Sequence, residues 1–465
     1  MLGKSNHMHP ILRDFREIKN IKPLVIVSLG HGATHWVNGI FLVLLPFIVQ
    51  DLSLSYTTAG TMVSIFFIAA VAITIISGPI IDITKKYITA QFLCLLSGFV
   101  ALIIMGQSTS VYTLAIAAIF IGICVSGWHT PSIPYLSQLY EKNRGLALSI
   151  HTVGASLGDG IAPPIAGLIM LYVTWQETSM ILSIPIIIMA IYITRSLPNI
   201  ERDNSSEDLI RNINYLKELK VLCTSIDPIR FVPISALAMV PLMRLQTSFL
   251  LAIAMAIPIA LLIEFSYQLL KRNTKYVEGV RGLIRSKDML RLCLLAGLWS
   301  MTQNGVTVFL PLYLVFVMDA SPALVGFALF SIQVGAIFGG PIVGTWSDQI
   351  GRRPIVIYAL LIAAFLLFLL PLFGNIYLFI IIVSLAGCAL YSIRPVIHSW
   401  TMDLSDKNSS GSAVSMLFTA QAAMTGTVPI IGGLIADNFG LKLVFILLTI
   451  TSLLALILSL LMPKK

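Results

Sequence analysis

The chain has 465 residues, of which 57% are hydrophobic and only 11% are charged. An ordinary soluble domain carries about 25% charged residues and 45–50% apolar ones, so this composition excludes a soluble globular protein. Apolar runs of about 18 residues or more recur along the whole chain and predict an all-α polytopic membrane protein. The formal net charge of +9 does not indicate a nucleic-acid partner, because the lysines and arginines gather in loops on one side of the membrane.

Twelve apolar runs predict membrane-spanning helices in two sets of six. The first set lies near residues 24–50, 57–81, 88–107, 111–138, 144–171 and 174–195. The second set lies near residues 288–317, 322–345, 354–373, 375–401, 410–435 and 441–462. We expect an N-terminal six-helix bundle over residues 1–195, a C-terminal six-helix bundle over residues 288–465, and a cytoplasmic linker over residues 196–287.

Basic residues mark one side of the membrane. Loops on the side of the N-terminus carry Lys85, Lys86, Lys142, Arg144, Arg352 and Arg353. Loops on the facing side carry acids, namely Asp51, Glu177, Asp319 and Asp437, with Lys442 as the one basic exception in the two six-helix sets. Because cytoplasmic loops carry the excess of lysine and arginine, we expect both termini in the cytoplasm and the chain in the inner cell membrane as a multi-pass protein.

The two sets of six helices form an internal repeat. Three pairs of motifs share one spacing, because 344 − 78, 304 − 38 and 429 − 163 all give 266. The pairs are Gly78-x-x-x-Asp82 with Gly344-x-x-x-Asp348, Asn38-Gly39 with Asn304-Gly305, and Pro163…Gly167 with Pro429…Gly433. Two parallel six-helix repeats resemble the fold of the major facilitator superfamily, in which substrate binds near the membrane midplane between the halves.

The segment between the halves is longer than a simple linker. Residues 231–270 are apolar, interrupted by Arg244, and lie between charged stretches. Both flanks are cytoplasmic by charge, so the segment crosses the membrane twice or not at all. Two crossings need about 20 residues each, which favours a hydrophobic hairpin with Arg244 in an outer turn. A re-entrant or membrane-surface hairpin is the alternative.

A motif at the predicted cytoplasmic side of the second half resembles the cytoplasmic loop motif of the major facilitator superfamily. It consists of Gly344, Asp348, Gly351, Arg352 and Arg353. Its glycines allow two helices to meet closely, and Asp348 can pair with an arginine across the loop. The N-terminal copy keeps Gly78 and Asp82 but has Lys85 in place of the last glycine. The resemblance implies a role in conformational gating.

A glycine–proline motif in the fifth span resembles the fifth-helix motif typical of antiporters in this superfamily. The motif and its second-half mirror contain Gly154, Gly158, Pro163, Pro429 and Gly433. These residue types suit a helix bend and close helix packing. Small residues at four-residue spacing are also common in any membrane bundle, so packing alone is an equal alternative.

Four longer stretches carry a finer resemblance, namely Ser28-Leu-Gly-His31, Gly122…His129…Pro131, Arg144-Gly145-Leu-Ala147 and Gly432-Gly433-Leu-Ile-Ala-Asp437. They resemble the fosmidomycin resistance protein family, whose members are proton-coupled drug exporters of the inner membrane. It implies that His31 and His129 match histidines of that family. The chain departs from the family where His35 replaces an acid, and where His151 and Asp159 replace small or aromatic residues.

Protonatable side chains lie inside the predicted spans, where lipid disfavours them. A carboxylate at the centre of a membrane helix costs roughly 2.5–3.5 kcal/mol, yet the fifth span contains Asp159. Five histidines also lie in spans, namely His31, His35, His129, His151 and His398. Histidine titrates near neutral pH and suits a proton relay, so we assign proton coupling to Asp159, His151, His31 and His35. Any single histidine is as compatible with a satisfied core position.

We expect no metal and no cofactor. His31 and His35 lie four residues apart on one helical face, which would permit a metal site, but no acid lies near them in the sequence. The five cysteines are scattered without metal-ligand or disulfide spacing. No nucleophile-and-base arrangement or phosphate loop indicates an enzyme.

The superfamily resemblance implies a substrate cavity lined by the first, fourth, seventh and tenth spans. The residues that it would gather, beside His31 and His35, are Trp128, His129, Gln303, Asn304, Arg394, His398 and Trp400. Arg394 would bind an anionic substrate or neutralise Asp159. The alternative is an arginine near a helix end whose side chain extends to the membrane interface.

These features together predict a proton-coupled secondary transporter, an antiporter that exports a small amphiphilic or anionic compound by alternating access. A proton symporter that imports an organic anion has the same architecture and is the first alternative. A non-transporting membrane sensor on the same fold is the second, although intramembrane charges are costly without a function. The expected partners are a small-molecule substrate, protons and the lipid bilayer, and we expect a monomer.

Overall fold

The computed structural model describes residues 20–198, 233, 286–405 and 410–463. The helices of the N-terminal half are α2 (Lys22–Asp51), α3 (Tyr56–Thr84), α4 (Tyr87–Gly106), α5 (Val111–Gly127), α6 (His129–Leu139), α7 (Arg144–Ile169) and α8 (Trp175–Ser196). The C-terminal half has α13 (Lys287–Phe316), α14 (Pro322–Val334), the π-helix η1 (Gly335–Gly339), α15 (Gly340–Ile350), α16 (Arg352–Leu369), the 3₁₀ turn η2 (Leu370–Leu372), α17 (Ile376–Ser392), α18 (Arg394–Asp403), α19 (Ser410–Phe439) and α20 (Leu441–Leu460). No strand occurs in these residues, which confirms the all-α fold.

Each of the predicted spans corresponds to a helix or to consecutive helical pieces within the described residues. Four spans are built from consecutive pieces: α5 with α6, α14 with η1 and α15, α16 with η2, and α17 with α18. The hairpin predicted over residues 231–270 lies outside the described residues, apart from position 233. The hairpin and the boundaries of the linker therefore stay predictions.

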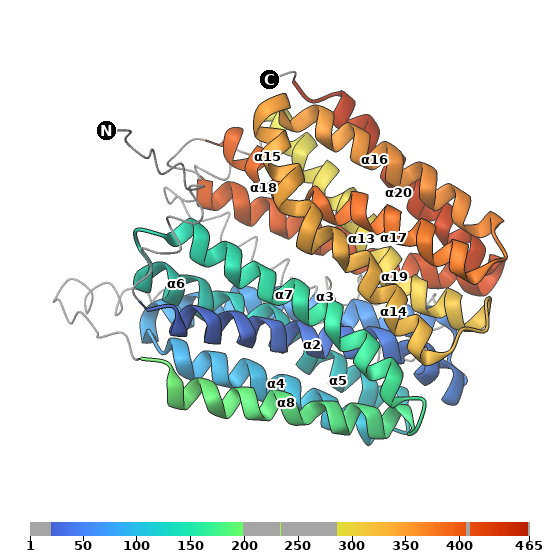
Figure 1. The fold of residues 1–465 in the computed structure, drawn as a ribbon, viewed down its shortest axis with the longest axis horizontal. Coiled ribbons are helices and arrows are strands. Elements are labelled where there is room, and N and C mark those ends of the chain that lie inside the picture. Colours follow the sequence, from blue (N-terminus) through green and yellow to red (C-terminus); the bar gives the residue numbers. More distant parts are fainter. Residues whose placement is uncertain (1–19, 199–232, 234–285, 406–409, 464–465) are drawn as a thin grey trace, which may run out of the picture.

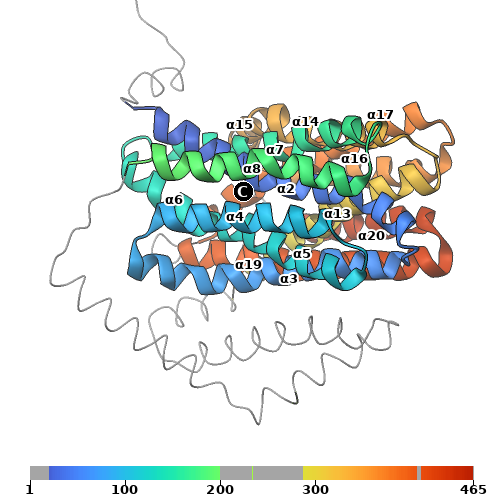
Figure 2. The same cartoon turned by 90° about the horizontal axis from the view of Figure 1, so that it is seen from below.

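The polar content of α7 sets it apart from the other spans. Eleven helices in the described part of the chain are long and apolar enough to cross a membrane, and α7 is not among them. Its glycines, with His151 and Asp159, lower its hydropathy below that of its neighbours. α7 packs against α2 of its own half and against α14 of the other half (Figures 1 and 2). Protein therefore covers the polar residues that lipid would disfavour.

We call the end of the bundle that carries Asp51, Glu177, Asp319 and Asp437 the acidic face. Five helices that begin there start with a hydroxyl or amide side chain that accepts a hydrogen bond from the first turn. The capping residues are Ser55, Ser110, Thr174, Ser321 and Asn375. Such caps satisfy backbone N–H groups that have no partner inside the helix, and they fix where these spans begin.

The two halves contact each other toward the acidic face. α3 packs against α19, and α7 packs against α14. Gly60 of α3 faces the carbonyl of Pro429, and Gly326 of α14 faces the carbonyl of Pro163, each so closely that a Cβ would overlap the oxygen. Toward the opposite end, the basic face, the ribbons of the two halves diverge, as Figure 1 shows on the side of α6 and α18. The structure is therefore closed at the acidic face.

A carboxylate of the second half caps a helix of the first half at the acidic face. Asp437 of α19 accepts hydrogen bonds from the backbone N–H groups of Tyr56 and Thr57, both at 2.8 Å. The hydroxyl of Thr57 also donates to this carboxylate. The first N–H groups of a helix lack partners, and the helix dipole favours a negative charge beside them. Asp437 therefore links the halves in this conformation, and we call the contact the interhalf cap.

The internal repeat extends to backbone conformation at the basic face. Gly351, between α15 and α16, has a φ of 96° and a ψ of 155°, a region that essentially only glycine occupies. Lys85, 266 positions earlier in the chain, has a φ of 51° and a ψ of 20°, the left-handed helical conformation, which costs a residue with a side chain roughly 1–2 kcal/mol. A residue with positive φ therefore ends the second span of each half, but ψ differs, so the two turns are not the same.

Candidate functional site

α2 and α7 pack in parallel and bring together the polar residues of the first half. Gly154 and Gly158 of α7 lie directly against the backbone carbonyls of Ser28 and Gly32 in α2. This approach is possible only because the glycines carry no side chain. The predicted glycine motif thus packs two helices of the same half, and its role in a helix bend stays a prediction.

Two side chains of α2 hold the acid of α7. Asp159 Oδ2 lies 2.7 Å from His35 Nδ1, and Asp159 Oδ1 accepts a hydrogen bond from Asn38 Nδ2 at 2.9 Å. The side chains of His35 and Asp159 remain 16% and 19% exposed, so water reaches the pair. Among the described residues the ionic partner of Asp159 is His35 and not Arg394, the partner that the sequence suggested.

Three histidines surround His31. Its ring stacks on that of His151, with centroids 4.0 Å apart and an interplanar angle of 13°. It meets His35 and His129 edge-on, with centroids 4.9 Å and 4.8 Å away. The carbonyl oxygen of His151 lies 2.8 Å from His31 Nδ1, whereas His31 Nε2 is buried without a hydrogen-bond partner. The four histidines of α2, α6 and α7 thus form one cluster beside Asp159, which we call the histidine cluster.

The second half contributes a positive charge across from this cluster. Arg394 Nη2 donates a hydrogen bond to Gln303 Oε1 at 3.3 Å, and the guanidinium carbon lies 5.8 Å from the centroid of the Tyr391 ring. The hydroxyl groups of Tyr391 and Thr307 lie 2.7 Å apart. Arg394 interacts electrostatically with His129, and Tyr391 with Asp159, across the boundary between the halves. Within the described ranges Arg394 forms no ion pair.

A small cavity lies between the halves beside Asp159. Its volume is about 10 Å³, room for about one water molecule. The first half lines it with Leu42, Asp159 and Pro163, and the second half lines it with Thr307, Leu329 and Gln333. The acid therefore lies at the boundary that must move if the halves change their relative orientation.

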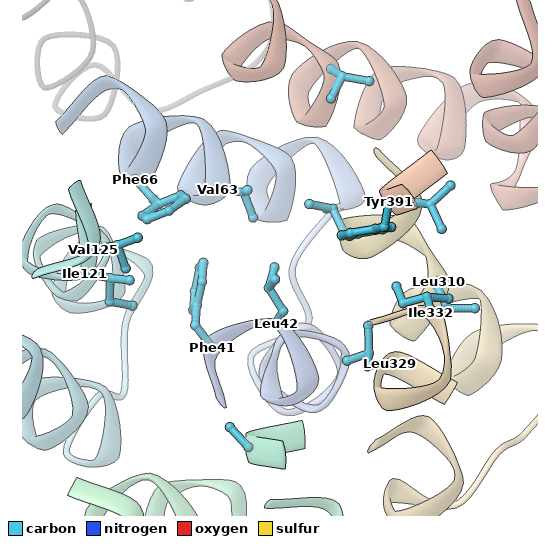
Figure 3. Close-up of a cluster of buried hydrophobic side chains, with 14 of the residues drawn as sticks. Phe41, Leu42, Val63, Phe66, Ile121, Val125, Leu310, Leu329, Ile332 and Tyr391 are labelled. Atoms are coloured by element: carbon cyan, nitrogen blue, oxygen red, sulfur yellow. The ribbon is translucent and has the colours of Figure 1, made fainter. Parts of the chain in front are cut away.

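Apolar side chains close the structure between this cavity and the acidic face. Phe41 and Leu42 follow His35 on α2 in the direction of the acidic face and are buried. Figure 3 shows them beside Val63 and Phe66 of α3, with Leu310 and Leu329 of the second half nearby. These buried apolar side chains exclude water from the part of the bundle between the polar site and the acidic face.

The predicted gating motif of the second half forms a network at the basic face. Arg352 pairs with Asp348 of α15 and bonds Asp403 of α18 through Nε at 3.1 Å. It also donates to the hydroxyl of Ser347 at 2.6 Å. Arg353 donates to the carbonyls of Ser459 and Leu460 at the end of α20. The arginines thus tie α15, α16, α18 and α20 together; the side chain of Asp82, in the first copy, lies outside the described set.

Three residues that the sequence assigned to the cavity have other contacts. Trp128 is completely buried, and its indole donates to His151 Nε2 at 3.1 Å, so it supports the histidine cluster from behind. Asn304 Nδ2 donates to the carbonyl of Ser300 in its own helix at 2.9 Å. Trp400 is buried in α18. The other predicted cavity residues do not line the small cavity beside Asp159 either: His129 belongs to the histidine cluster, and Arg394 bonds Gln303.

Sequence reasoning missed Thr307, Gln333 and Asp437. Thr307 bonds the carbonyl of Gln303 one turn earlier on α13, so it shares a helical face with a predicted cavity residue. Gln333 is a polar residue in an otherwise apolar part of α14. These two positions carried a signal that helical periodicity could have used. The role of Asp437 depends on how the halves meet, which no local pattern encodes.

Comparison with known families matches this chain to the Major Facilitator Superfamily over residues 27–313 and 292–465. It is 31% identical over 186 residues to the multi-drug resistance efflux pump PmrA of Streptococcus pneumoniae, which covers 39% of this chain and 46% of that protein. It is 27% identical over 176 residues to a bicyclomycin resistance protein homolog of Haemophilus influenzae, which covers 37% and 44%. The match spans less than half the length of either relative.

Solved structures share the fold over nearly the whole chain. A bacterial homolog of the human lysosomal transporter Spinster, in an inward-facing and unoccupied conformation, has a TM-score of 0.71 and 15% identity, with 98% of this chain and 97% of that chain covered. A POT family transporter in complex with 5-aminolevulinic acid has a TM-score of 0.68 and 15% identity, with 94% of each chain covered. At these identities the likeness establishes the fold alone.

Proposed function

Because the chain belongs to the major facilitator superfamily, and is therefore a membrane transporter and not an enzyme, we propose that it exports a small amphiphilic or anionic compound in exchange for protons. The coupling to protons, the direction and the substrate class are the proposed part. The observation that carries the proposal is the pair of His35 and Asp159 beside the cavity between the halves. The pair combines a proton-binding carboxylate with a position at the moving boundary.

The pair supports proton coupling by its partners and its location. An exchanger needs a group that binds a proton from one side and releases it to the other. When Asp159 takes up a proton, it loses its charge and its ionic contact with His35, while the hydrogen bond from Asn38 can persist. Because Asp159 also lines the cavity between the halves, a change in their orientation would change the water around it. A carboxylate that loses water gives up its charge more readily.

The second half supports a substrate with an anionic or polar end. Arg394 presents a guanidinium group that has no ionic partner among the described residues, and Gln303 Nε2 is buried without a hydrogen-bond partner. Guanidinium groups bind carboxylates and phosphates in a fork geometry. The aromatic ring of Phe418, 5.1 Å from that of His398, adds an apolar surface nearby. This combination fits an amphiphilic compound.

The relatives support export of a toxic compound. Two proteins that resemble parts of this chain are named as a multi-drug efflux pump and a bicyclomycin resistance protein homolog. The resemblance of the stretches around His31 and His129 to the fosmidomycin resistance family points the same way. Import of an organic anion by proton symport remains the second candidate, because the guanidinium of Arg394 would serve either direction. Placement in the inner membrane, with both termini in the cytoplasm, and a monomeric state belong to the same proposal.

Everted membrane vesicles from an overexpressing strain test the proposal. A growth screen against a panel of toxic compounds first selects a candidate substrate. Respiration then acidifies the vesicle interior, and an exporter should accumulate the compound inside until a protonophore collapses the gradient. Expulsion of the compound under the same gradient would establish symport, and accumulation that persists with the protonophore would exclude proton coupling.

Gating at the basic face leads to a separate prediction. Asp348→Asn removes one of the two carboxylates that Arg352 bridges between α15 and α18. The side chain is 63% exposed, and exposed ion pairs contribute about 0–1 kcal/mol to stability, so the protein should remain folded in the membrane. We expect transport to slow by roughly tenfold, equivalent to about 1.4 kcal/mol in the barrier between conformations. Initial rates of uptake into everted vesicles, normalised to protein amount, measure the effect.

Asp288→Asn is the matched control for this variant. Asp288 also pairs with an arginine, Arg291, but on the same helix and with both side chains 39% exposed. The Asp288→Asn variant should leave the initial rate of uptake unchanged. Wild-type rates in Asp348→Asn would remove the gating role of the motif.

A further inference from the structure

The histidine cluster places three imidazoles in one small volume. One ring nitrogen from each of His31, His35 and His129 lies within 4.8 Å of the other two. A cation at the centre of such a triangle would lie no more than about 2.8 Å from each nitrogen, within roughly 0.8 Å of the Zn–N bond length of about 2.0–2.1 Å. Side-chain rotations alone can close a difference of this size.

His31 and His35 each use one ring nitrogen for a contact outside the triangle, which leaves the other nitrogen for a cation. His31 Nδ1 must donate to the carbonyl oxygen of His151, because a carbonyl cannot donate. His35 Nδ1 faces the carboxylate of Asp159 at 2.7 Å. Each ring in its neutral form then carries its lone pair on Nε2. Histidines that bind metals almost always donate their other ring N–H to a carboxylate or a backbone carbonyl, and these two have both kinds of partner.

The ring nitrogens that lack such contacts are available to bind a cation. His31 Nε2 is buried and has no hydrogen-bond partner. No hydrogen bond from a described residue to a ring nitrogen of His129 is present in the structure. Leaving a buried ring nitrogen without a partner costs about 1–3 kcal/mol, and a bound cation would remove that cost.

We infer that His31, His35 and His129 form a binding site for a borderline divalent transition cation of the Zn²⁺ class. Three imidazoles with a fourth position open to water are an established zinc geometry, and imidazole also suits Cu²⁺ and Ni²⁺. Asp159 serves as the carboxylate behind His35 and provides a negative charge beside the cation, whereas Arg394 opposes it from the second half. The spacing of His31 and His35 permits a metal site, but the acid lies 124 residues from His35 in the sequence and reaches it only through the packing of α7 on α2.

Metal binding to the purified protein tests the inference without any transport measurement. The full chain is purified without a polyhistidine tag in a His7→Ala/His9→Ala background, which removes the two histidines near the N-terminus. Calorimetric titration with Zn²⁺ should show one saturable site. Titration with Co²⁺ should produce the visible absorption of a four-coordinate cobalt centre with nitrogen ligands. Absence of both signals in this parent protein would overturn the inference.

Variants then identify the ligands. His31→Ala and the more conservative His129→Asn should each abolish the Co²⁺ absorption, and Asp159→Asn should weaken Zn²⁺ binding roughly 10–100-fold, as loss of a partner behind a metal-bound histidine does. His398→Ala is the matched control, since this membrane histidine lies in the second half. His151→Phe should retain binding, because it keeps the backbone carbonyl that His31 Nδ1 bonds and an aromatic ring that can stack on His31. Size-exclusion profiles confirm folding, and Zn²⁺ affinity unchanged in both His31→Ala and His129→Asn would overturn the site.

Discussion

Asp159→Asn should abolish gradient-driven transport while leaving substrate binding and downhill exchange in place. The amide can keep the contacts that hold the carboxylate, since its oxygen can accept from Asn38 and its NH₂ group can donate to His35. The variant therefore fixes the neutral state at this position without disturbing the packing of α2 on α7. A group that cannot change its charge cannot carry a proton between the two sides. In everted vesicles, the ratio of internal to external substrate should fall to one.

Exchange of labelled for unlabelled substrate, measured without a gradient, distinguishes loss of coupling from loss of the protein. Asp51→Asn is the matched control, because its carboxylate bonds Trp175 and Gln176 within the first half and lies far from the cavity. It should concentrate substrate normally. If Asp159→Asn also concentrates substrate, the coupling group lies elsewhere in the histidine cluster, with His31 and His35 the next candidates.

Removal of the interhalf cap should shift the balance between the two orientations of the halves. Asp437→Ala deletes the acceptor for the N–H groups of Tyr56 and Thr57 and the charge at the start of α3. Loss of a helix cap costs about 0.5–2 kcal/mol, and a change of one or two kcal/mol alters a population ratio by a factor of about 5–30. We expect the state closed at the acidic face to lose population by that factor. The contact is absent when the halves separate at the acidic face, so the substitution does not destabilise the state that is open there.

Spin labels on the acidic face report this shift. Gln107 of the first half and Gly374 of the second half are exposed, and each is replaced by cysteine to carry a label. Pulsed electron–electron distance measurements should show a longer distance gaining population in Asp437→Ala. Asp51→Ala, which removes a carboxylate of the same face without touching the second half, should leave the distribution unchanged. An unaltered distribution in Asp437→Ala would mean that the glycine contacts at Gly60 and Gly326 alone hold the closed state.

Hydropathy and the internal repeat predicted the helices well for a physical reason. A segment that crosses a bilayer must form its backbone hydrogen bonds internally and present apolar side chains. Local composition is therefore enough to predict where such a segment lies in the sequence. Even α7, whose composition is the least apolar, was recognised because its polar and glycine residues fit an interior helix. The same locality explains why the repeat aligns Lys85 with Gly351, the two positions with positive φ at the ends of the second spans.

Pairings between helices could not be predicted in the same way. The sequence identified His35 and Asp159 as costly groups, but it offered Arg394 as the partner of the acid, because periodicity shows which face of a helix is polar and not which helix covers it. His35 is the partner because Gly154 and Gly158 bring α7 against the carbonyls of α2. Asp437 was recognised only as an acid in an outer loop, since its bond to α3 exists in one orientation of the halves.

The glycine contacts between α2 and α7 also constrain what transport can do to the proton site. Backbone packed directly on backbone leaves no side chain to slide, so α2 and α7 travel as one rigid body, and His35 and Asp159 travel with them. A reorientation of the two halves would therefore leave Asp159 paired with His35 and would not give it a new partner. The reorientation can alter the wall of the cavity that belongs to the second half, which consists of Thr307, Leu329 and Gln333. The proton would then be released by a change in local hydration as that wall withdraws, with every bond inside the first half left intact.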